Sequence, residues 1–183
     1  MRTLISELLD FRKQEQGYLK LKVECRDIVA FTKEVYMSFY EYALKHHIAY
    51  RFETSEASIN LWFDPVQMQK VIINLLSNAF KYTPAEGNIT VSIRMHSQQV
   101  VLQMKDSGTG IPQESIHKIF DQFDQIDGQR SNLSLGTGIG LTFSKNIVEL
   151  HKGNIRVESK VDEGSCFTVI LKTGNSHFKL DEL

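Results

Sequence analysis

The stretch Asp106-Ser107-Gly108-Thr109-Gly110-Ile111-Pro112 follows an apolar run, Val100-Val101-Leu102-Gln103-Met104, that is typical of a β-strand. Asp106 therefore lies where a strand ends and a glycine-rich turn begins. A carboxylate in this place can accept a hydrogen bond from a donor such as the amine of adenine. Gly108 and Gly110 have no Cβ, so the backbone there can come close to a flat ring. The stretch predicts a site for a nucleotide base.

A second glycine-rich stretch, Gly136-Thr137-Gly138-Ile139-Gly140-Leu141, precedes a helical pattern over residues 141–150. Glycines that open a helix leave backbone N–H groups available to phosphate oxygens. Taken alone, each stretch is also typical of an ordinary turn. Neither is a Walker A loop or the spaced glycine motif of dinucleotide-binding folds. Together they indicate a pocket with one end for a base and one for phosphates.

A third element, Asn74-Leu75-Leu76-Ser77-Asn78-Ala79-Phe80-Lys81-Tyr82, lies upstream of both stretches. Asn74, Asn78 and Lys81 are spaced i, i+4 and i+7, which places them on one face of a helix. The opposite, apolar face consists of Val71, Ile72, Leu75, Leu76 and Ala79. A solvated helix face is the alternative interpretation of the two asparagines.

These blocks, in this order, resemble the ATP-binding catalytic domain of sensor histidine kinases, a family whose pocket is shared with gyrase-type, Hsp90-type and MutL-type ATPases. The asparagine helix resembles the N box, residues 106–110 the G1 box, residues 136–141 the G2 box and Ile119-Phe120-Asp121-Gln122-Phe123 the F box. The resemblance covers residues 19–171 and extends to hybrid two-component sensors of Bacteroides-type bacteria. It implies an α+β fold, a two-layer sandwich of a mixed, mostly antiparallel sheet with helices on one face, as the alternation of strands and helices also predicts.

The resemblance implies ATP and Mg²⁺ as ligands and assigns roles residue by residue. Asn74 would bind the metal, and Asn78 would lie beside it near the phosphates. Lys81 would neutralise phosphate charge; the alternative is an ordinary surface lysine at a helix end. Tyr82 would contact the nucleotide or fill the core. Asp106 would bind adenine. The remaining nucleotide-site residues that we expect are Gly108, Gly110, Ile111, Phe123, Gly136, Thr137, Gly138, Ile139, Gly140 and Leu141.

Residues 124–135 are polar and without periodicity, and the resemblance implies a mobile lid over ATP. Phe120 and Phe123 would anchor one end of the lid, and Gly136 and Gly138 would act as its hinges. Many kinases of this family carry an arginine where this chain has Gln125. We expect Arg130, inside the lid, to replace it in catalysis.

Two departures from the family pattern bear on activity. Gyrase-type ATPases place a water-activating glutamate where this chain has Lys70, which argues against a hydrolase. None of the six histidines has the sequence context of the family's phosphoacceptor. The chain therefore resembles a fragment of a kinase that phosphorylates a histidine on a separate hairpin. The alternatives left open are a clamp- or chaperone-type ATPase and a nucleotide-sensing module without catalysis.

The 183 residues are of ordinary globular composition and carry a net charge of −1, which does not suggest a nucleic-acid partner. We expect residues 1–17 to end the second helix of a dimerisation hairpin, residues 18–173 to form the catalytic domain and residues 174–183 to be a loose tail. Expected partners are that hairpin and the receiver domain of a response regulator. The resemblance implies that the whole protein is a membrane-anchored homodimer and that this domain lies in the cytoplasm.

The pattern of apolar residues also predicts individual elements. We expect a half-buried strand over residues 19–25 and one long helix from the Asp27 cap to Lys45. Asp64-Pro65 should start the asparagine helix. A short helix is expected over residues 115–120, and strands are expected near residues 48–52, 59–63, 88–95, 99–105, 154–159 and 166–171.

Overall fold

The computed structural model describes residues 19–121 and 140–183. In order, its elements are β1 (Glu24–Asp27), α2 (Ile28–Met37), α3 (Tyr40–Lys45), β2 (Ala49–Thr54), β3 (Asn60–Phe63), α4 (Pro65–Tyr82), β4 (Asn88–His96), β5 (Gln99–Asp106), the 3₁₀ turn Gln113–Ser115, α5 (Gly140–Leu150), β6 (Asn154–Lys160) and β7 (Gly164–Lys172). Among the described residues, no helix is long and apolar enough to cross a bilayer.

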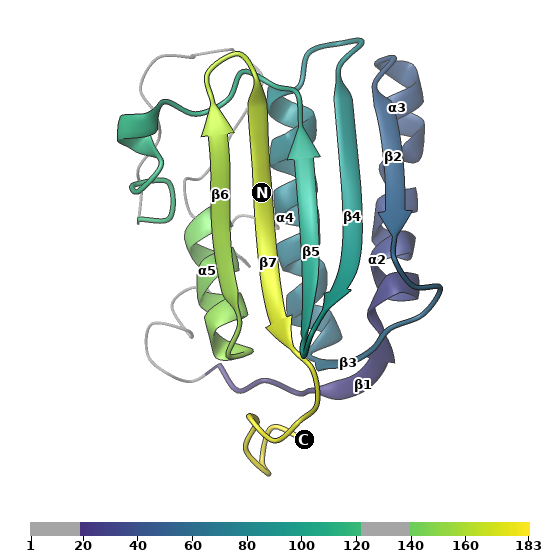
Figure 1. Ribbon diagram of the computed structural model, residues 1–183, viewed down its shortest axis with the longest axis vertical. Helices are drawn as coiled ribbons and strands as arrows, with labels where there is room; N and C mark the ends of the chain where they lie inside the picture. Colours follow the sequence, from purple (N-terminus) through teal and green to yellow (C-terminus); the bar gives the residue numbers. More distant parts are fainter. Residues whose placement is uncertain (1–18, 122–139) are drawn as a thin grey trace.

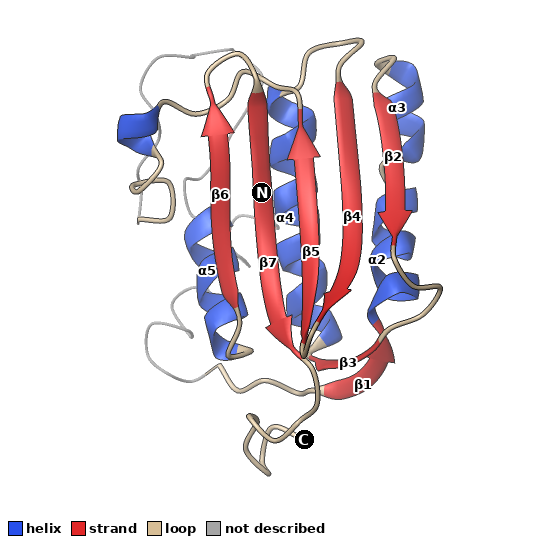
Figure 2. Ribbon diagram, viewed as in Figure 1, coloured by secondary structure: helices blue, strands red, loops and turns tan. Residues whose placement is uncertain are grey.

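The main sheet has five strands in the order β2-β4-β5-β7-β6. Only the β2–β4 pair is parallel, and the other three pairs are antiparallel. Helices α2 to α5 all lie on one face of this sheet, and β1 pairs with β3 in a separate small sheet (Figures 1 and 2). The predicted two-layer sandwich with a mixed, mostly antiparallel sheet is confirmed.

Helix α4 is the central helix of the second layer. Its apolar face is buried against the sheet through Met68, Val71, Ile72, Leu75, Leu76, Ala79 and Phe80. The side chain of Asp64 caps its start by accepting a hydrogen bond from the N–H of Gln67, and Pro65 follows in the first turn. The predicted Asp-Pro start is confirmed. Because the apolar face is fixed against the sheet, Asn74 and Asn78 remain only half-buried.

The long helix expected from Asp27 to Lys45 is wrong, because the chain breaks after Met37 into α2 and α3. The N–H groups of Ser38 and Phe39 bond to carbonyls only three residues back, and the Ser38 hydroxyl also donates to the Val35 carbonyl. Such local bonds compete with the helical pattern. The break allows Phe39 to stack on Phe80 of α4.

Three other local predictions differ from the structure. Residues 19–23 alternate in burial without joining a strand, and β1 starts only at Glu24. The short helix expected over residues 115–120 is the 3₁₀ turn Gln113–Ser115 followed by further turns. The C-terminal residues, expected to be loose, pack on residues 20–23. Phe178 is buried with Leu21 and Val23, and the Val23 N–H donates to the Glu182 carbonyl at 2.7 Å.

We expect Phe178→Ala to destabilise the fold by about 3 kcal/mol, since it empties the centre of this small cluster. Trp62, the single tryptophan, packs against the same cluster, so its emission should shift to the red. Thermal unfolding and fluorescence measure the two effects. The matched control is Leu180→Ala in the same tail, where the side chain is 93% exposed. Equal stability of the two variants would show that the tail is loose after all.

Candidate functional site

Asp106 is the last residue of β5 and is only 5% exposed. One carboxylate oxygen, Oδ1, accepts hydrogen bonds from the N–H groups of Gly108 at 2.8 Å and Ser165 at 3.2 Å. Burial raises the pKa of the carboxyl above its usual value, while these two N–H donors act in the opposite direction. The other oxygen, Oδ2, receives no hydrogen bond from any described residue. Asp106 therefore has a fixed orientation and one acceptor available for a ligand.

The turn after Asp106 packs on the end of α4. A Cβ on Gly108 would lie 2.5 Å from the carbonyl oxygen of Tyr82, which leaves room only for glycine. The N–H of Thr109 donates to the same Tyr82 carbonyl at 3.2 Å. The end of the asparagine helix and the end of β5 are thereby held together, as the sequence blocks predict.

The turn also contacts the β6–β7 connection. Gly110 has φ +67°, and the N–H of the next residue, Ile111, donates to the Ser159 hydroxyl at 2.8 Å. Ser159 in turn donates to the Gly164 carbonyl and lies 2.9 Å from the Ser165 hydroxyl. The side chain of Ile111 is partly buried against the main core. Sequence reasoning did not identify Ser159 or Ser165 as part of the site, because a serine within or beside a strand gives no signal of the turn that it contacts.

Asn74, half-buried on α4, contacts the first turns of α5. Its amide nitrogen donates to the hydroxyl of Ser144 at 2.9 Å. A Cβ on Gly140 would lie only 2.3 Å from the amide oxygen of Asn74. The structure thus brings the predicted metal ligand to the predicted phosphate end of the pocket. Leu141, the next site residue, is partly buried and packs against the core.

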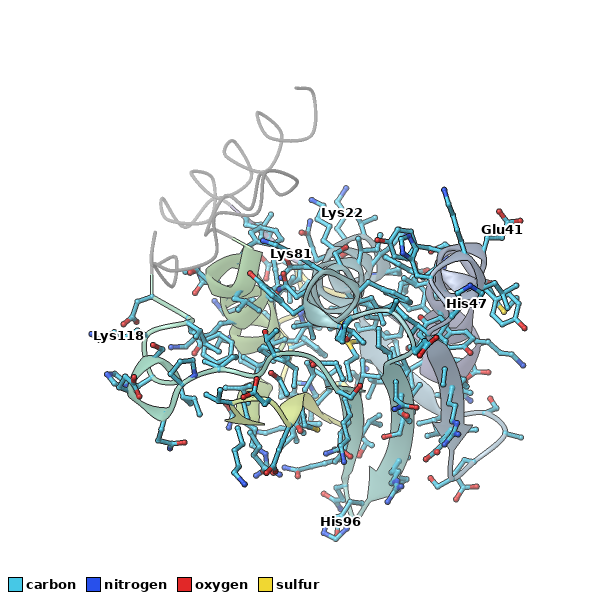
Figure 3. All side chains as sticks on the ribbon, turned by 90° about the horizontal axis from the view of Figure 1, so that it is seen from above. Lys22, Glu41, His47, Lys81, His96 and Lys118 are labelled. Atoms are coloured by element: carbon cyan, nitrogen blue, oxygen red, sulfur yellow. The ribbon has the colours of Figure 1, made fainter. Side chains whose placement is uncertain are left out.

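The other predicted site residues of α4 are Asn78, Lys81 and Tyr82. Asn78 follows Asn74 by one turn, is half-buried and makes no hydrogen bond with another described side chain. Lys81 and Tyr82 are exposed at the helix end, with the Lys81 Nζ 4.9 Å from the Tyr82 ring centre. Figure 3 shows Lys81 on the helix side of the sheet.

Lys70 lies one turn before Asn74 on α4. Its Nζ is 3.5 Å from the Gln67 amide oxygen and 5.7 Å from the centre of the Phe143 ring on α5. These contacts place a cation, and not a general base, beside the Asn74 end of the site.

Several predicted residues fall outside the described part of the chain: Phe123, Gln125, Arg130, Gly136, Thr137, Gly138 and Ile139, together with the lid and residues 1–18. Their roles stay predictions. Phe120, which is described, is partly buried and forms an edge contact with Phe167 of β7.

His151 directly follows α5 and has a structural role. It is 1% exposed, its Nε2 accepts from the N–H of Asp64 at 3.0 Å, and its Nδ1 lies 2.8 Å from the Ile147 carbonyl. This arrangement needs the neutral ring with the proton on Nδ1, and burial lowers its pKa accordingly. His151 links the end of α5 to the start of α4 and is not available as a phosphoacceptor.

A surface hollow of about 390 Å³ lies elsewhere, between α2 and the start of α4. Phe31, Val35, Pro65 and Ile73 line it, and it contains none of the predicted site residues. The hollow therefore lies outside the candidate nucleotide site.

Comparison with known proteins decides the family. Residues 63–175 match the family described as "Histidine kinase-, DNA gyrase B-, and HSP90-like ATPase". The chain belongs to this family. The matched residues include α4, the Asp106 turn and α5. The predicted resemblance to the catalytic domain of histidine kinases is confirmed by the relatives and structures below.

The chain is 42% identical over 183 residues to Histidine kinase P4 of Formosa agariphila, covering 98% of this chain and 13% of that protein. The catalytic domain of histidine kinase ThkA has a similar structure, with a TM-score of 0.74 and 27% identity over 84% of this chain and 97% of that one. A structure of ThkA in complex with response regulator protein TrrA matches 97% of this chain and 50% of that one (TM-score 0.71, 26% identity). The chain spans 13–29% of the length of the curated relatives it matches.

The donor set fits a magnesium–nucleotide complex. Within the described residues, no group of three or more histidine, cysteine or acidic residues could hold a metal by itself. Asn74 offers one neutral oxygen beside the start of α5, which suits Mg²⁺ that takes its other ligands from phosphates and water. Asp106 Oδ2 offers the acceptor that an adenine amine needs.

We expect Asp106→Asn to weaken ADP binding by about 1.5–3 kcal/mol, because a charge-assisted hydrogen bond is lost. The amide can still accept from Gly108 and Ser165, but it then turns an NH₂ group toward the base, which suits the carbonyl of guanine. The preference for ADP over GDP should therefore fall in competition titrations. Asp162→Asn, in the neighbouring exposed turn, is the control. Unchanged preference in Asp106→Asn would remove this residue from the base site.

Proposed function

We propose that this chain is the catalytic module of a sensor histidine kinase and transfers the γ-phosphoryl group of ATP to a histidine on a separate hairpin. The observation that carries the proposal is the joint geometry of Asp106 and Asn74 at two ends of one site. Asp106 Oδ1 is held by two backbone N–H groups, which leaves Oδ2 without a hydrogen bond from a described residue, and the amide nitrogen of Asn74 donates to Ser144. The similarity to sensor kinases supports it.

In this proposal Asp106 binds the adenine amine, and Gly110 and Ile111 form the surface under the base. Asn74 would hold Mg²⁺, with Asn78 beside the phosphates and Lys81 offsetting their charge. Mg²⁺, when bound, neutralises charge on the phosphate oxygens. The backbone N–H groups at the start of α5, with those of residues 136–139, would bind phosphate. Arg130 and Phe123 keep their proposed roles in the lid.

The chemical step is a transfer from oxygen to nitrogen. A ring nitrogen of the acceptor histidine attacks the γ-phosphorus, the bond to the β–γ bridging oxygen breaks, ADP leaves and the imidazole loses its ring proton. This chain contributes by holding ATP in place while the hairpin approaches. Lys70 beside the Asn74 end gives no base to activate water, which favours transfer over hydrolysis.

The remaining partners are part of the same proposal. Residues 1–17 would be the C-terminal end of the second helix of the dimerisation hairpin and the linker, and residues 18–173 would form the catalytic domain. A response-regulator receiver domain would take the phosphoryl group from the histidine, a partner class suggested by the ThkA–TrrA complex. The whole protein would be a membrane-anchored homodimer with this domain in the cytoplasm.

The test is to mix this chain with the separately produced hairpin of the whole protein and γ-labelled ATP. We expect label on the hairpin in the presence of Mg²⁺, and none when the hairpin histidine is replaced by glutamine or when Asn74 is replaced by alanine. Release of free phosphate without the hairpin, at about one turnover per second or more, would favour the ATPase alternative instead. Nucleotide binding without any transfer would favour the sensing module.

A further inference from the structure

Strand β2 lies at one edge of the main sheet and pairs only with β4 among the described strands. In Figure 1 no described strand is drawn beyond it. Its register with β4 runs without a bulge from Ala49 to Thr54, and the strand contains no proline. Bulges and prolines are two of the features that usually protect an edge strand from pairing with another chain, and β2 has neither.

The backbone groups on the outer edge of β2 belong to every second residue. The N–H groups of Ala49 and Ser55 both donate to carbonyls in or just before β4, at 2.8 and 3.1 Å. Because successive N–H groups of a strand point to opposite edges, those of Tyr50, Phe52 and Thr54 point outward. The Tyr50 carbonyl accepts from a tyrosine hydroxyl of α2 at 3.1 Å, and a carbonyl oxygen can accept a second hydrogen bond.

The two charged residues of β2 are Arg51 and Glu53, and both are exposed. Side chains alternate along a strand, and Tyr50 and Phe52 pack against the core. Arg51 and Glu53 therefore point to the sheet face that the helices do not cover. Glu53 lies 3.9 Å from Arg94 on β4, which is a loose contact between exposed groups. The open edge thus presents one positive and one negative charge, two residues apart.

Two copies of β2 can pair antiparallel through their outward groups, and the charges select one register. A two-fold axis at Arg51 would place the two arginines opposite each other, and an axis at Glu53 would do so with the two glutamates. An axis at Phe52 pairs Arg51 of each copy with Glu53 of the other, and Tyr50 with Thr54. An axis at either end of the strand pairs too few residues. Opposite charges on facing strands stabilise the pair and like charges destabilise it, so the register centred on Phe52 is favoured.

We propose that the outer edge of β2 binds the same edge of a second copy of this chain, with the two-fold axis at Phe52 and with reciprocal contacts between Arg51 and Glu53. The two five-stranded sheets then continue as one sheet, with all helices on the same face. This contact does not depend on the proposed function. A weak contact suffices in the whole protein, because two copies tethered in the proposed homodimer have an effective concentration of about millimolar.

The helices next to β2 add apolar surface beside this edge. Helix α3 packs on β2, and Figure 1 shows it close to the outer strand. Large apolar side chains near the junction of α2 and α3 are exposed by 40–59%, and they are Met37, Tyr40, Tyr42 and Leu44. An exposed apolar group of this kind beside an unpaired strand edge is typical of an interaction surface.

Sedimentation equilibrium tests the proposal on this chain at concentrations up to about 1 mM, where we expect reversible dimers with a dissociation constant of about 0.1–1 mM. Arg51→Glu and Glu53→Arg each turn two attractive contacts into repulsive ones and should each weaken association by about tenfold. The double variant Arg51→Glu/Glu53→Arg restores opposite charges and should associate like the parent. Matched controls are Arg156→Glu and Glu158→Arg, exposed on β6 at the other edge of the sheet, which should leave association unchanged.

A mixing experiment separates the contact from any effect of the substitutions on folding. In a mixture of Arg51→Glu with Glu53→Arg, both cross-strand contacts pair opposite charges. The two variants should therefore bind each other about as tightly as the parent binds itself, although neither associates well alone. Dilution followed by NMR locates the contact, since the amide signals of Tyr50, Phe52 and Thr54 should move with concentration and those of β6 should not.

Several results would overturn the proposal. A chain that stays monomeric at about 1 mM would show that this edge does not bind a second copy, at a concentration that detects even weak association. Association that neither single substitution weakens, or concentration-dependent shifts away from β2, would assign the contact to another surface. Single variants that are weakened but do not recover when mixed would show that the substitutions act on the fold and not on paired charges.

Discussion

The hydrogen bonds that Asp106 accepts from the N–H groups of Gly108 and Ser165 hold the base end of the site together. They join the end of β5 to the turn that follows it and to the start of β7. The same turn packs so closely on the carbonyl of Tyr82 that Gly108 cannot carry a side chain. With one of its two oxygens, the buried carboxylate joins β5, the glycine turn and β7, and the turn itself packs on the end of α4.

The phosphate end depends on a second close approach, between α4 and α5. Asn74 rests on Gly140 and Ser144, while His151 at the other end of α5 binds the N–H of Asp64 at the start of α4. The two helices are therefore joined at both ends of their contact. Since α4 also reaches the Asp106 turn, a base bound at one end and phosphates bound at the other would share a single rigid support. Lys70, packed against Phe143 in the same contact, gives that end a positive charge.

Much of this could be predicted from the sequence, because the informative residues are locally unambiguous. The Asp64-Pro65 pair and the apolar spacing of α4 fix that helix, and a strand followed by Asp-Ser-Gly fixes the position of Asp106. The errors arise where tertiary contacts override the local pattern. Ser38 ends a helix that the apolar spacing alone would continue. Residues 19–23 alternate in burial because they pack on Phe178, and not because they pair in a sheet. The tail is expected to be loose because its sequence is mostly polar, although its single phenylalanine is buried. Ser144 could not be found either, since a serine within a helix gives no signal of its partner on another helix.

The central claim is that the Asp106 end and the Asn74 end form one nucleotide site. The most direct measurement follows the backbone amides of Gly108, Ser165 and Leu141 and the side-chain amide of Asn74 by NMR during titration. Adenosine should shift only the signals of Gly108 and Ser165. Mg-ADP should shift all four signals along curves with one dissociation constant. Separate dissociation constants for the two ends, or no shift at either, would contradict the account.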